Sequence, residues 1–458
     1  MKQKNHFSTY LLIGTMLFGM FFGAGNIIFP ISMGQLAGTN FWPALIGFLI
    51  TAIGLPFLGI IAIGLTNSRG VKELASSVHP IFGLLFSILL YLTIGPFFAI
   101  PRTATVPFVV GIEPYINPEY STIILASFTF IFFSCVLYFS LNPAKILDYI
   151  ARYLTPIFLL FLFALIIISI VKPMGSFVEP SSTYINEAFL TGFKDGYHTM
   201  DALASLAFGI IVVQALKQRG ITDPKEIGSA TVKSGLIAIT LMAIIYGFIT
   251  YMGASSVLSL GMYSNGGQLL NAISNFYFGS YGALFLTLIF IIACLKTSIG
   301  LITACSEFFH EIVPKISYRQ FVVILCIISF SFANFGLSTI ISYSEVVLMF
   351  LYPLAIVLII LSLIQFIIKI NSTVYLSTII FTLVISFFDG YKTFIKNIPL
   401  GELSFLTNCS KFLSQWVPLY KEGLGWIVPS IIGFIIGFII YFIKEKRKDE
   451  KKSFVQSA

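Results

Sequence analysis

The stretch GMFFGAGNIIFP, residues 19–30, lies within an apolar run that begins near residue 8 and ends near residue 36. A run of this length can cross a bilayer as one helix, because about 20 apolar residues span the hydrocarbon core. Its middle nevertheless holds three glycines, the amide of Asn26 and Pro30. Glycine and proline are the poorest helix formers. We therefore predict that the helix is interrupted within this stretch.

The interruption has two explanations. Lipid cannot satisfy the backbone groups that a break frees, so a break is tolerated only where protein or a polar cavity receives it. Broken helix ends carry partial charges, positive at the N–H end and negative at the carbonyl end, which suit the carboxylate of a zwitterion and a small cation. Alternatively, the small residues only allow another helix to pack closely. The GAGN segment at 23–26 does not by itself decide between them.

The composition of the chain is that of an integral membrane protein. Of its 458 residues, 57% are hydrophobic and only 10% are charged, whereas soluble proteins devote about 25% to charge. We expect an all-α protein with twelve transmembrane helices and no water-soluble domain, because the longest gaps (172–188, 254–280 and 394–425) read as loops. The apolar runs are 8–36, 41–65, 81–111, 121–141, 147–171, 189–215, 229–253, 281–308, 320–338, 341–367, 374–393 and 426–443.

The distribution of charge excludes nucleic acid as a partner, although the formal net charge is +8. With both termini in the cytoplasm, lysine and arginine are about three times as frequent inside as outside, as the positive-inside rule expects. The basic tail at 444–458 then contacts anionic lipid headgroups. The five cysteines and four histidines have no paired spacing, so neither a disulfide framework nor a cofactor is expected. The only metal considered is a coupling sodium ion.

A second run supports the ligand-binding explanation of the first. GYHTMDALASLAFG (196–209) places Asp201 inside the sixth run, followed by a Ser- and Ala-rich stretch that ends at Gly209. Five runs lie in 1–171, five more in 189–367, and two additional ones in 374–443. An interrupted helix at the head of each five-span set is typical of inverted-repeat secondary transporters, which bind substrate between the two breaks.

Ionisable residues inside spans are costly and indicate function. Asp201 could coordinate a cation, carry a proton itself, or cap the unwound segment. Lys296 precedes Thr297 and Ser298, and its ammonium could take the place of a bound cation or serve only a structural purpose. Arg102 could pair with an acid such as Glu113, or act as a gate.

An enzyme is the alternative function. His198 and Asp201, three residues apart, would share one helix face and could act as an acid–base pair in a membrane-embedded enzyme. Glu345 lies near the end of a span, and we assign it no role.

Four blocks of sequence resemble a known family. They are FFGAGNIIFP (21–30), GPFFAIPRTATVPF (95–108), GYHTMDALASLAFG (196–209) and ACLKTSIGLITACSEFF (293–309), with LYPLAI (351–356) as a weaker fifth. The chain is similar over nearly its whole length to the branched-chain amino acid:cation symporter family, of the amino acid–polyamine–organocation superfamily. The resemblance implies a leucine-transporter-like fold of five-plus-five inverted repeats, with discontinuous helices 1 and 6 and two further C-terminal helices.

The resemblance also implies an activity and a location. The expected activity is import of leucine, isoleucine and valine across a bacterial cytoplasmic membrane by alternating access, coupled to a sodium or proton gradient. The expected partners are the amino acid substrate and the lipid bilayer. The oligomeric state is not predicted.

The family's site residues can be carried over by position. The backbone at Ala24 and Gly25 would receive the substrate carboxylate, and Asn26 would hold an ion beside it. The side chain of the substrate would be surrounded by Ala204, Ser205, Leu206 and Phe208. A second cation would bind to Gly19, Phe22, Cys294, Thr297 and Ser298. Leu203 stands where sodium-dependent members of the fold usually have a hydroxyl, and together with Lys296 it leaves proton coupling open beside sodium.

Overall fold

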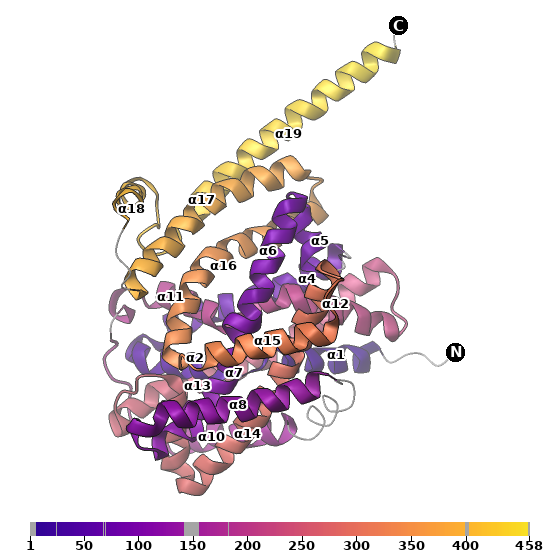
Figure 1. Ribbon diagram of the computed structural model, residues 1–458. Coiled ribbons are helices and arrows are strands. Elements are labelled where there is room, and N and C mark those ends of the chain that lie inside the picture. Colours follow the sequence, from indigo (N-terminus) through magenta and orange to yellow (C-terminus); the bar gives the residue numbers. More distant parts are fainter. Residues whose placement is uncertain are drawn as a thin grey trace. The chain divides into compact units, whose positions relative to one another are not determined.

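The computed structural model describes residues 6–23, 25–66, 68, 70–141, 155–181, 183–398 and 403–456, and the regular structure in these ranges is entirely helical (Figure 1). Within them, nine helices are long and apolar enough to cross a membrane, judged by length and composition, and three shorter helices are also apolar. Each of the twelve apolar runs overlaps at least one of these helices. The fifth run, 147–171, lies partly outside the described residues, which resume at Thr155.

The chain forms two compact units, each drawn from three separate stretches. The first unit comprises Met1–Phe57, Tyr91–Ala204 and Lys233–Ser344, and the second comprises Leu58–Leu90, Ser205–Val232 and Glu345–Ala458. This division follows contacts between residues, whereas the division at 1–171 and 189–367 follows a repeat in the order of spans.

The first unit contains both breaks, the residues between α1 and α2 and those before α12. Its elements are α1 (His6–Phe21), α2 (Gly25–Ala37), η1 (Gly38–Asn40), α3 (Phe41–Leu49), η2 (Ile50–Gly54), η3 (Thr93–Phe97), α7 (Ala99–Gly111), η4 (Glu113–Tyr115), η5 (Pro118–Tyr120), α8 (Ser121–Ser140), α10 (Thr155–Val171), α11 (Tyr184–Asp195), η7 (Gly196–Thr199), α14 (Gly266–Ile312) and α15 (Tyr318–Ala333). Five helices contribute to both units: α4 (Leu55–Thr66), α6 (Pro80–Leu92), α12 (Asp201–Gln218), α13 (Pro224–Leu260) and α16 (Leu337–Ile367).

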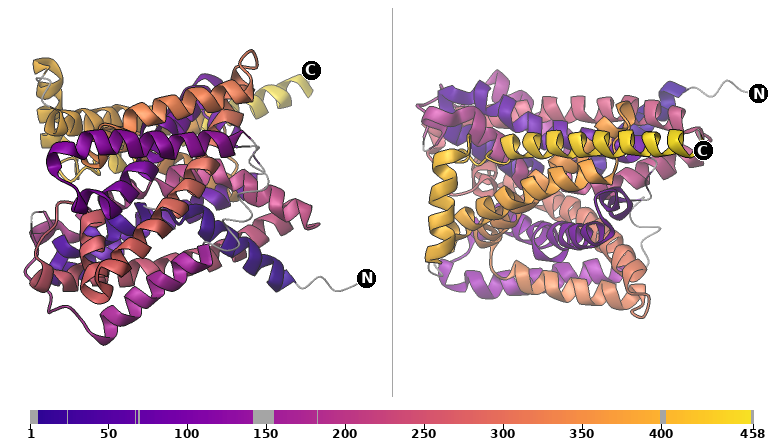
Figure 2. Two further views of the ribbon diagram at one scale, coloured as in Figure 1. Left: turned by 60° about the horizontal axis from the view of Figure 1, so that its bottom comes forward. Right: turned by 90° about the horizontal axis from the view of Figure 1, so that it is seen from above.

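The second unit contains the C-terminal helices α17 (Ser372–Asn397), α18 (Ser404–Trp416) and α19 (Ile427–Gln456), and the short α5 (Val71–Ser76). Helices α17 and α19 lie side by side (Figures 1 and 2). The Ser377 hydroxyl donates a 2.7 Å hydrogen bond to the Gly433 carbonyl, so small residues let the two helices approach closely. Helix α19 continues through the basic tail as far as Gln456.

The first run is interrupted as predicted. Helix α1 ends at Phe21 and α2 begins at Gly25. Ala24, one of the predicted substrate-binding residues, lies outside the described residues. The Gly23 N–H donates to the side-chain oxygen of Asn26 at 3.1 Å, and this bond replaces the one that a continuous helix would make to Gly19.

The sixth run is also interrupted, within the block 196–209. The break lies before Asp201: η7 ends at Thr199, and Met200 adopts the left-handed conformation with φ 61°. A non-glycine residue with this φ is strained and is found mainly at functional or tightly constrained positions. Gly209 lies inside α12, where an added Cβ would meet Ile63 at 2.7 Å, so this glycine serves close packing within the second unit.

The third run contains a break that the sequence analysis did not predict. Helix α6 ends at Leu92 and α7 begins at Ala99, with the non-helical Gly95 (ψ −127°) between them. Pro96 follows and cannot continue the hydrogen-bond ladder. A Cβ on Gly95 would lie 2.8 Å from the Cys305 sulfur. Glycine is therefore required by a close approach of helix α14 as well as by the turn.

The three gaps predicted to be loops are partly helical. Helix α13 continues to Leu260, and α14 begins at Gly266 with a kink at Gly279, where φ is 63°. Helix α18 occupies the middle of the 394–425 gap and exposes Phe405 and Phe412. The sequence did not predict α18 because its polar residues interrupt the apolar run.

Candidate functional site

A buried polar cluster joins the two interrupted helices within the first unit. The Asn26 amide nitrogen, in the first turn of α2, donates a 2.5 Å hydrogen bond to Asp201 Oδ2, at the first residue of α12. The same amide also donates to the Tyr246 hydroxyl on α13, which lies 3.4 Å from Asp201 Oδ2. The three side chains are only 3%, 4% and 0% exposed, respectively. Two breaks that are distant in sequence therefore meet at one carboxylate.

Local sequence explains why each member is placed here. Asn26 Oδ1 accepts from Gly23 and so stabilises the turn between α1 and α2. The Thr199 hydroxyl accepts from the Asp201 N–H at 3.3 Å, and an acidic residue is favourable at a helix N-terminus. The positions of Asn26 and Asp201 thus follow from the two breaks themselves.

The cluster presents the oxygen atoms of a carboxylate and a hydroxyl in a buried setting. A buried carboxylate needs compensating partners, which the Asn26 amide nitrogen and the Tyr246 hydroxyl supply. Carboxylate and hydroxyl oxygens also suit a small hard cation, and a carboxylate can carry a proton itself. The Asn26 oxygen, expected to hold an ion, accepts from the Gly23 N–H instead. The arrangement therefore suits Asp201 as the residue that exchanges a cation.

The start of α2 is positively polarised and closely packed. A Cβ on Gly25 would lie 3.3 Å from Phe29 Cε2 and 3.7 Å from Arg102 Nη2. The N-terminus of a helix attracts anions, and the guanidinium of Arg102 adds a full positive charge nearby. This arrangement is suited to a carboxylate, the role that the sequence assigns to Gly25.

Arg102 does not pair with Glu113 within the described residues. Its Nη1 donates to the His198 carbonyl at 2.8 Å, and its guanidinium lies 5.1 Å from the centre of the Phe29 ring. Glu113 accepts instead from Gln268 at 3.3 Å. Arg102 therefore holds the carbonyl end of the second break.

His198 and Asp201 do not share a helix face, because the left-handed Met200 separates η7 from α12. The His198 ring stacks on Phe29 with the ring centres 5.3 Å apart. Its Nδ1 has no hydrogen-bond partner among the described residues. This geometry does not provide the acid–base pair that the enzyme alternative requires.

The residues expected to bind a second cation lie on α1 and α14. Lys296 Nζ donates to the Gly19 carbonyl at 3.2 Å, so the lysine points toward the break. A Cβ on Gly23 would lie 3.7 Å from the Thr297 hydroxyl oxygen. Ser298 and Cys294 are buried, and Phe22 continues the turn through a 2.8 Å bond from its N–H to the Phe18 carbonyl.

The expected side-chain pocket lies on α12, which belongs to both units. Ala204 belongs to the first unit, while Ser205, Leu206 and Phe208 belong to the second. All four are buried. A Cβ on Gly59 would lie 2.1 Å from Ser205 Oγ, which places the hydroxyl against α4. Leu203, the expected departure from the sodium-dependent pattern, is fully buried.

Two residues of the site were missed by sequence reasoning. Tyr246 completes the cluster, and Phe29 carries both the stack with His198 and the contact with Arg102. No site residue was predicted in the seventh run, 229–253, and Phe29 was quoted in the first block without a role. A tyrosine in the interior of the seventh run, whose buried hydroxyl needs a partner, was the signal available for Tyr246.

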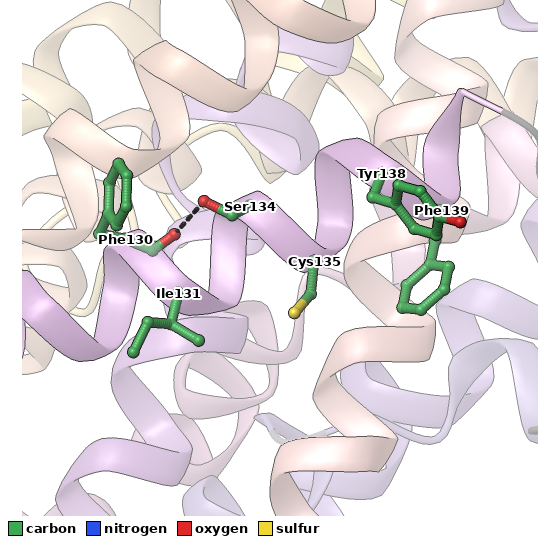
Figure 3. A pocket seen from close by; sticks show the side chains of 6 residues that line it. All are labelled: Phe130, Ile131, Ser134, Cys135, Tyr138 and Phe139. Carbon is green, nitrogen blue, oxygen red and sulfur yellow. Dashed lines mark hydrogen bonds between the residues drawn. The ribbon is translucent and has the colours of Figure 1, made fainter.

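A separate apolar pocket lies along α8 and is lined by residues of that helix alone (Figure 3). Ser134 donates within the helix to the Phe130 carbonyl at 2.7 Å. The surrounding side chains of Ile131 and Tyr138 are more than 60% exposed. An exposed apolar helix face is typical of a surface that contacts lipid.

Comparison with known proteins gives a match along almost the entire chain. The model of a family described as branched-chain amino acid transport protein matches residues 6–444. The chain is 44% identical over 433 residues to the branched-chain amino acid permease BrnQ of Bacillus subtilis, covering 94% of this chain and 97% of the relative. It is 42% identical to the permease BraB of the same organism, covering 94% and 95%.

Solved structures share the fold at low sequence identity. The inward-facing conformation of Mhp1 matches with a TM-score of 0.58 and 11% identity, covering 95% of this chain and 91% of that one. MhsT in complex with L-phenylalanine matches with a TM-score of 0.54 and 14% identity, covering 95% and 97%. The all-helical fold is thus that of leucine-transporter-like carriers.

Proposed function

Because the chain belongs to the branched-chain amino acid transport protein family, we propose that it imports leucine, isoleucine and valine together with a cation. Its family and curated relatives are transport proteins rather than enzymes. The observation that carries the proposal is the hydrogen bond between Asn26 and Asp201. It links the start of α2 to the carboxylate at the start of α12, and in carriers with interrupted helices substrate binds between the two breaks.

The carboxylate and the side chain of the substrate each have a matching region near the breaks. Its carboxylate binds at the N-terminus of α2, at Ala24 and Gly25, beside the Arg102 guanidinium. Its side chain is surrounded by residues of α12, namely Ala204, Ser205, Leu206 and Phe208. An apolar pocket of this kind separates leucine from alanine by about 1–3 kcal/mol but distinguishes leucine poorly from isoleucine. A single carrier of this kind therefore takes all three branched-chain amino acids.

The coupling cation binds at the cluster. Asp201 supplies its carboxylate oxygens and the Tyr246 hydroxyl adds another, while the Asn26 amide nitrogen donates to both side chains. Either a sodium ion or a proton neutralises the carboxylate when the substrate is bound. When the cation and the amino acid are both bound, the Asp201 carboxylate is neutralised. In the empty site the same carboxylate is a charge inside the membrane, which is costly.

The carrier works by alternating access in a bacterial cytoplasmic membrane. Twelve crossings, with both termini in the cytoplasm, agree with the excess of lysine and arginine in the segments assigned to that side. The five-span sets, 1–171 and 189–367, act as inverted repeats around the site, and 374–443 adds two further spans.

Uptake of labelled leucine into proteoliposomes tests the proposal. The purified chain is reconstituted, and an inward sodium gradient or an inward proton gradient is imposed separately, with protein-free vesicles as the control. We expect one gradient to drive leucine above its equilibrium level, with competition by isoleucine and valine but not by lysine. Equilibration without accumulation under both gradients would reject coupling, and no saturable uptake would reject the transport function.

A further inference from the structure

The Gly19 carbonyl is an unusual backbone group in this fold. The last four carbonyls of an α-helix have no partner within the helix. In a continuing helix the Gly23 N–H would bond to Gly19, but here it donates to Asn26 Oδ1 at 3.1 Å. The Gly19 carbonyl is thereby left for another donor. Lys296 Nζ fills this role at 3.2 Å.

The surroundings of this carbonyl are those of a cation position. The carbonyl end of α1 carries partial negative charge. The Thr297 hydroxyl lies near Gly23. Ser298 Oγ, one residue further along α14, is fully buried and has no hydrogen-bond partner among the described residues. The Gly19 carbonyl thus accepts from one positive group, the Lys296 ammonium, whereas the Thr297 hydroxyl donates to the Ala293 carbonyl.

The ammonium and a free cation cannot both use this carbonyl. Two positive charges separated by about one hydrogen-bond length repel strongly where water is scarce. Among the described residues no carboxylate pairs with Lys296, whose one hydrogen bond there is to Gly19. The set Gly19, Phe22, Cys294, Thr297 and Ser298 therefore does not fit a sodium ion while Lys296 points into it.

We infer that the Lys296 ammonium is the resident cation at the carbonyl end of α1, so that a single exchangeable cation, bound at the Asp201 cluster, accompanies each amino acid. This inference rests on the proposed function for its last clause only. The position is a monovalent-cation site that the chain occupies with its own side chain. Lys296 acts as a positioning residue for the first break, which it holds open without an ion from solution.

The second break is held by the same kind of contact. Arg102 donates to the His198 carbonyl at 2.8 Å, just before the left-handed Met200. Arg102 lies in the third run and Lys296 in the eighth, five runs apart, as are the first and sixth runs that they hold. A tethered positive charge at a broken carbonyl end is thus used at both breaks, which argues against an accidental contact at Lys296.

The test removes the charge and asks whether a free cation replaces it. Lys296→Met keeps an unbranched apolar stem, and Lys296→Arg keeps the charge. Lys233→Met is the matched control, because Lys233 also contacts α1, with its ammonium 5.2 Å from the centre of the Tyr10 ring, but is exposed and bonds to no broken end. Thermal unfolding of each purified protein is followed in ~100 mM sodium chloride and in ~100 mM choline chloride.

We expect sodium to raise the melting temperature of Lys296→Met by about 2 °C relative to choline. Lys296→Arg and Lys233→Met should show the same small sodium response as the unaltered chain. An equal sodium response in Lys296→Met and the unaltered chain would overturn the inference. This measurement needs no transport, so it stays informative if leucine uptake fails.

A second measurement uses the unaltered chain and keeps the inference testable if Lys296→Met does not fold. The reversal potential of leucine flux in proteoliposomes gives the number of charges that cross per leucine. We expect one. A value of two would overturn the inference while leaving the proposed symport intact, whereas the absence of any leucine flux would count against the proposed function alone.

Discussion

The carboxylate of Asp201 accepts a 2.5 Å hydrogen bond from the side-chain amide of Asn26, although 175 positions separate the two residues in the chain. Each residue stands at the first turn of a helix that begins after a break. The bond therefore links the two breaks directly, because a change in the charge or position of either residue alters the hydrogen bond that the other one makes. This coupling is what a carrier needs to bind cation and substrate together.

Asp201→Asn should abolish gradient-driven accumulation of leucine while leaving exchange of leucine across the membrane measurable. The amide keeps the size of the carboxylate and one acceptor oxygen but removes the charge that a cation neutralises. We expect accumulation to fall at least about 100-fold, the loss expected for a charged hydrogen-bonding group at about 3 kcal/mol. Counterflow of labelled leucine measures the exchange.

Asp195→Asn serves as its control, because Asp195 is also a carboxylate near the second break and accepts a hydrogen bond from Tyr184 rather than from the cluster. We expect near-normal accumulation in this variant. Equal losses in both variants would mean that Asp201 contributes through folding and not through coupling.

Gly25→Leu should abolish leucine uptake while the protein still inserts in the membrane. A Cβ at this position already lies 3.3 Å from Phe29, and the larger side chain fills the approach of the carboxylate to the start of α2. We expect at least about a 100-fold fall in uptake, measured beside the amount of protein in the membrane. Gly300→Leu is the comparison, since nothing lies within 4 Å of its Cβ position. Wild-type uptake by Gly25→Leu would remove Gly25 from the site.

Tyr246→Phe should weaken the response to the coupling cation more than the affinity for leucine. The substitution deletes the hydroxyl that accepts from Asn26 and lies 3.4 Å from Asp201. A lost buried hydrogen bond of about 1–2 kcal/mol corresponds to roughly a tenfold rise in the cation concentration for half-maximal uptake. Tyr138→Phe, on the exposed face of α8, should change nothing. An unaltered cation dependence in Tyr246→Phe would place the hydroxyl outside the coupling site.

Arg102→Lys should reduce uptake roughly tenfold or more and lower thermal stability. Lysine cannot reproduce the planar guanidinium that both bonds His198 and lies over Phe29, and a buried carbonyl left without a donor costs about 1–3 kcal/mol. Uptake and the melting temperature are measured on the same preparation. A variant with normal uptake and normal stability would show that the second break does not depend on this contact.

Both breaks could be predicted from sequence, the second only to within the block 196–209. Gly23, Gly25 and Asn26 are poor helix formers next to one another, so local propensity decides the structure there. At the second break the decisive residue is Met200, which is not a typical left-handed residue and is held in place by its surroundings. Gly209, the glycine at the end of the block, does not mark the break, because it allows close packing against Ile63.

Side-chain direction was the other limit of sequence analysis. The helical spacing in 293–309 left open where the Lys296 side chain points, and the structure shows that its ammonium reaches the Gly19 carbonyl. Arg102 was expected to pair with an acid such as Glu113 or to act as a gate; within the described residues it donates to the His198 carbonyl, 96 positions away, and Glu113 accepts from Gln268. Charge alone identifies which buried residues need partners but not which partners they find.

The most direct test of the central claim is an experimental structure of the protein with leucine bound in the presence of the coupling cation. We expect both helices to remain broken. The leucine carboxylate should lie within hydrogen-bonding distance of the start of α2 at Gly25, and the leucine side chain should lie beside α12. Leucine bound elsewhere, or continuous helices through 21–25 and 196–201, would contradict it.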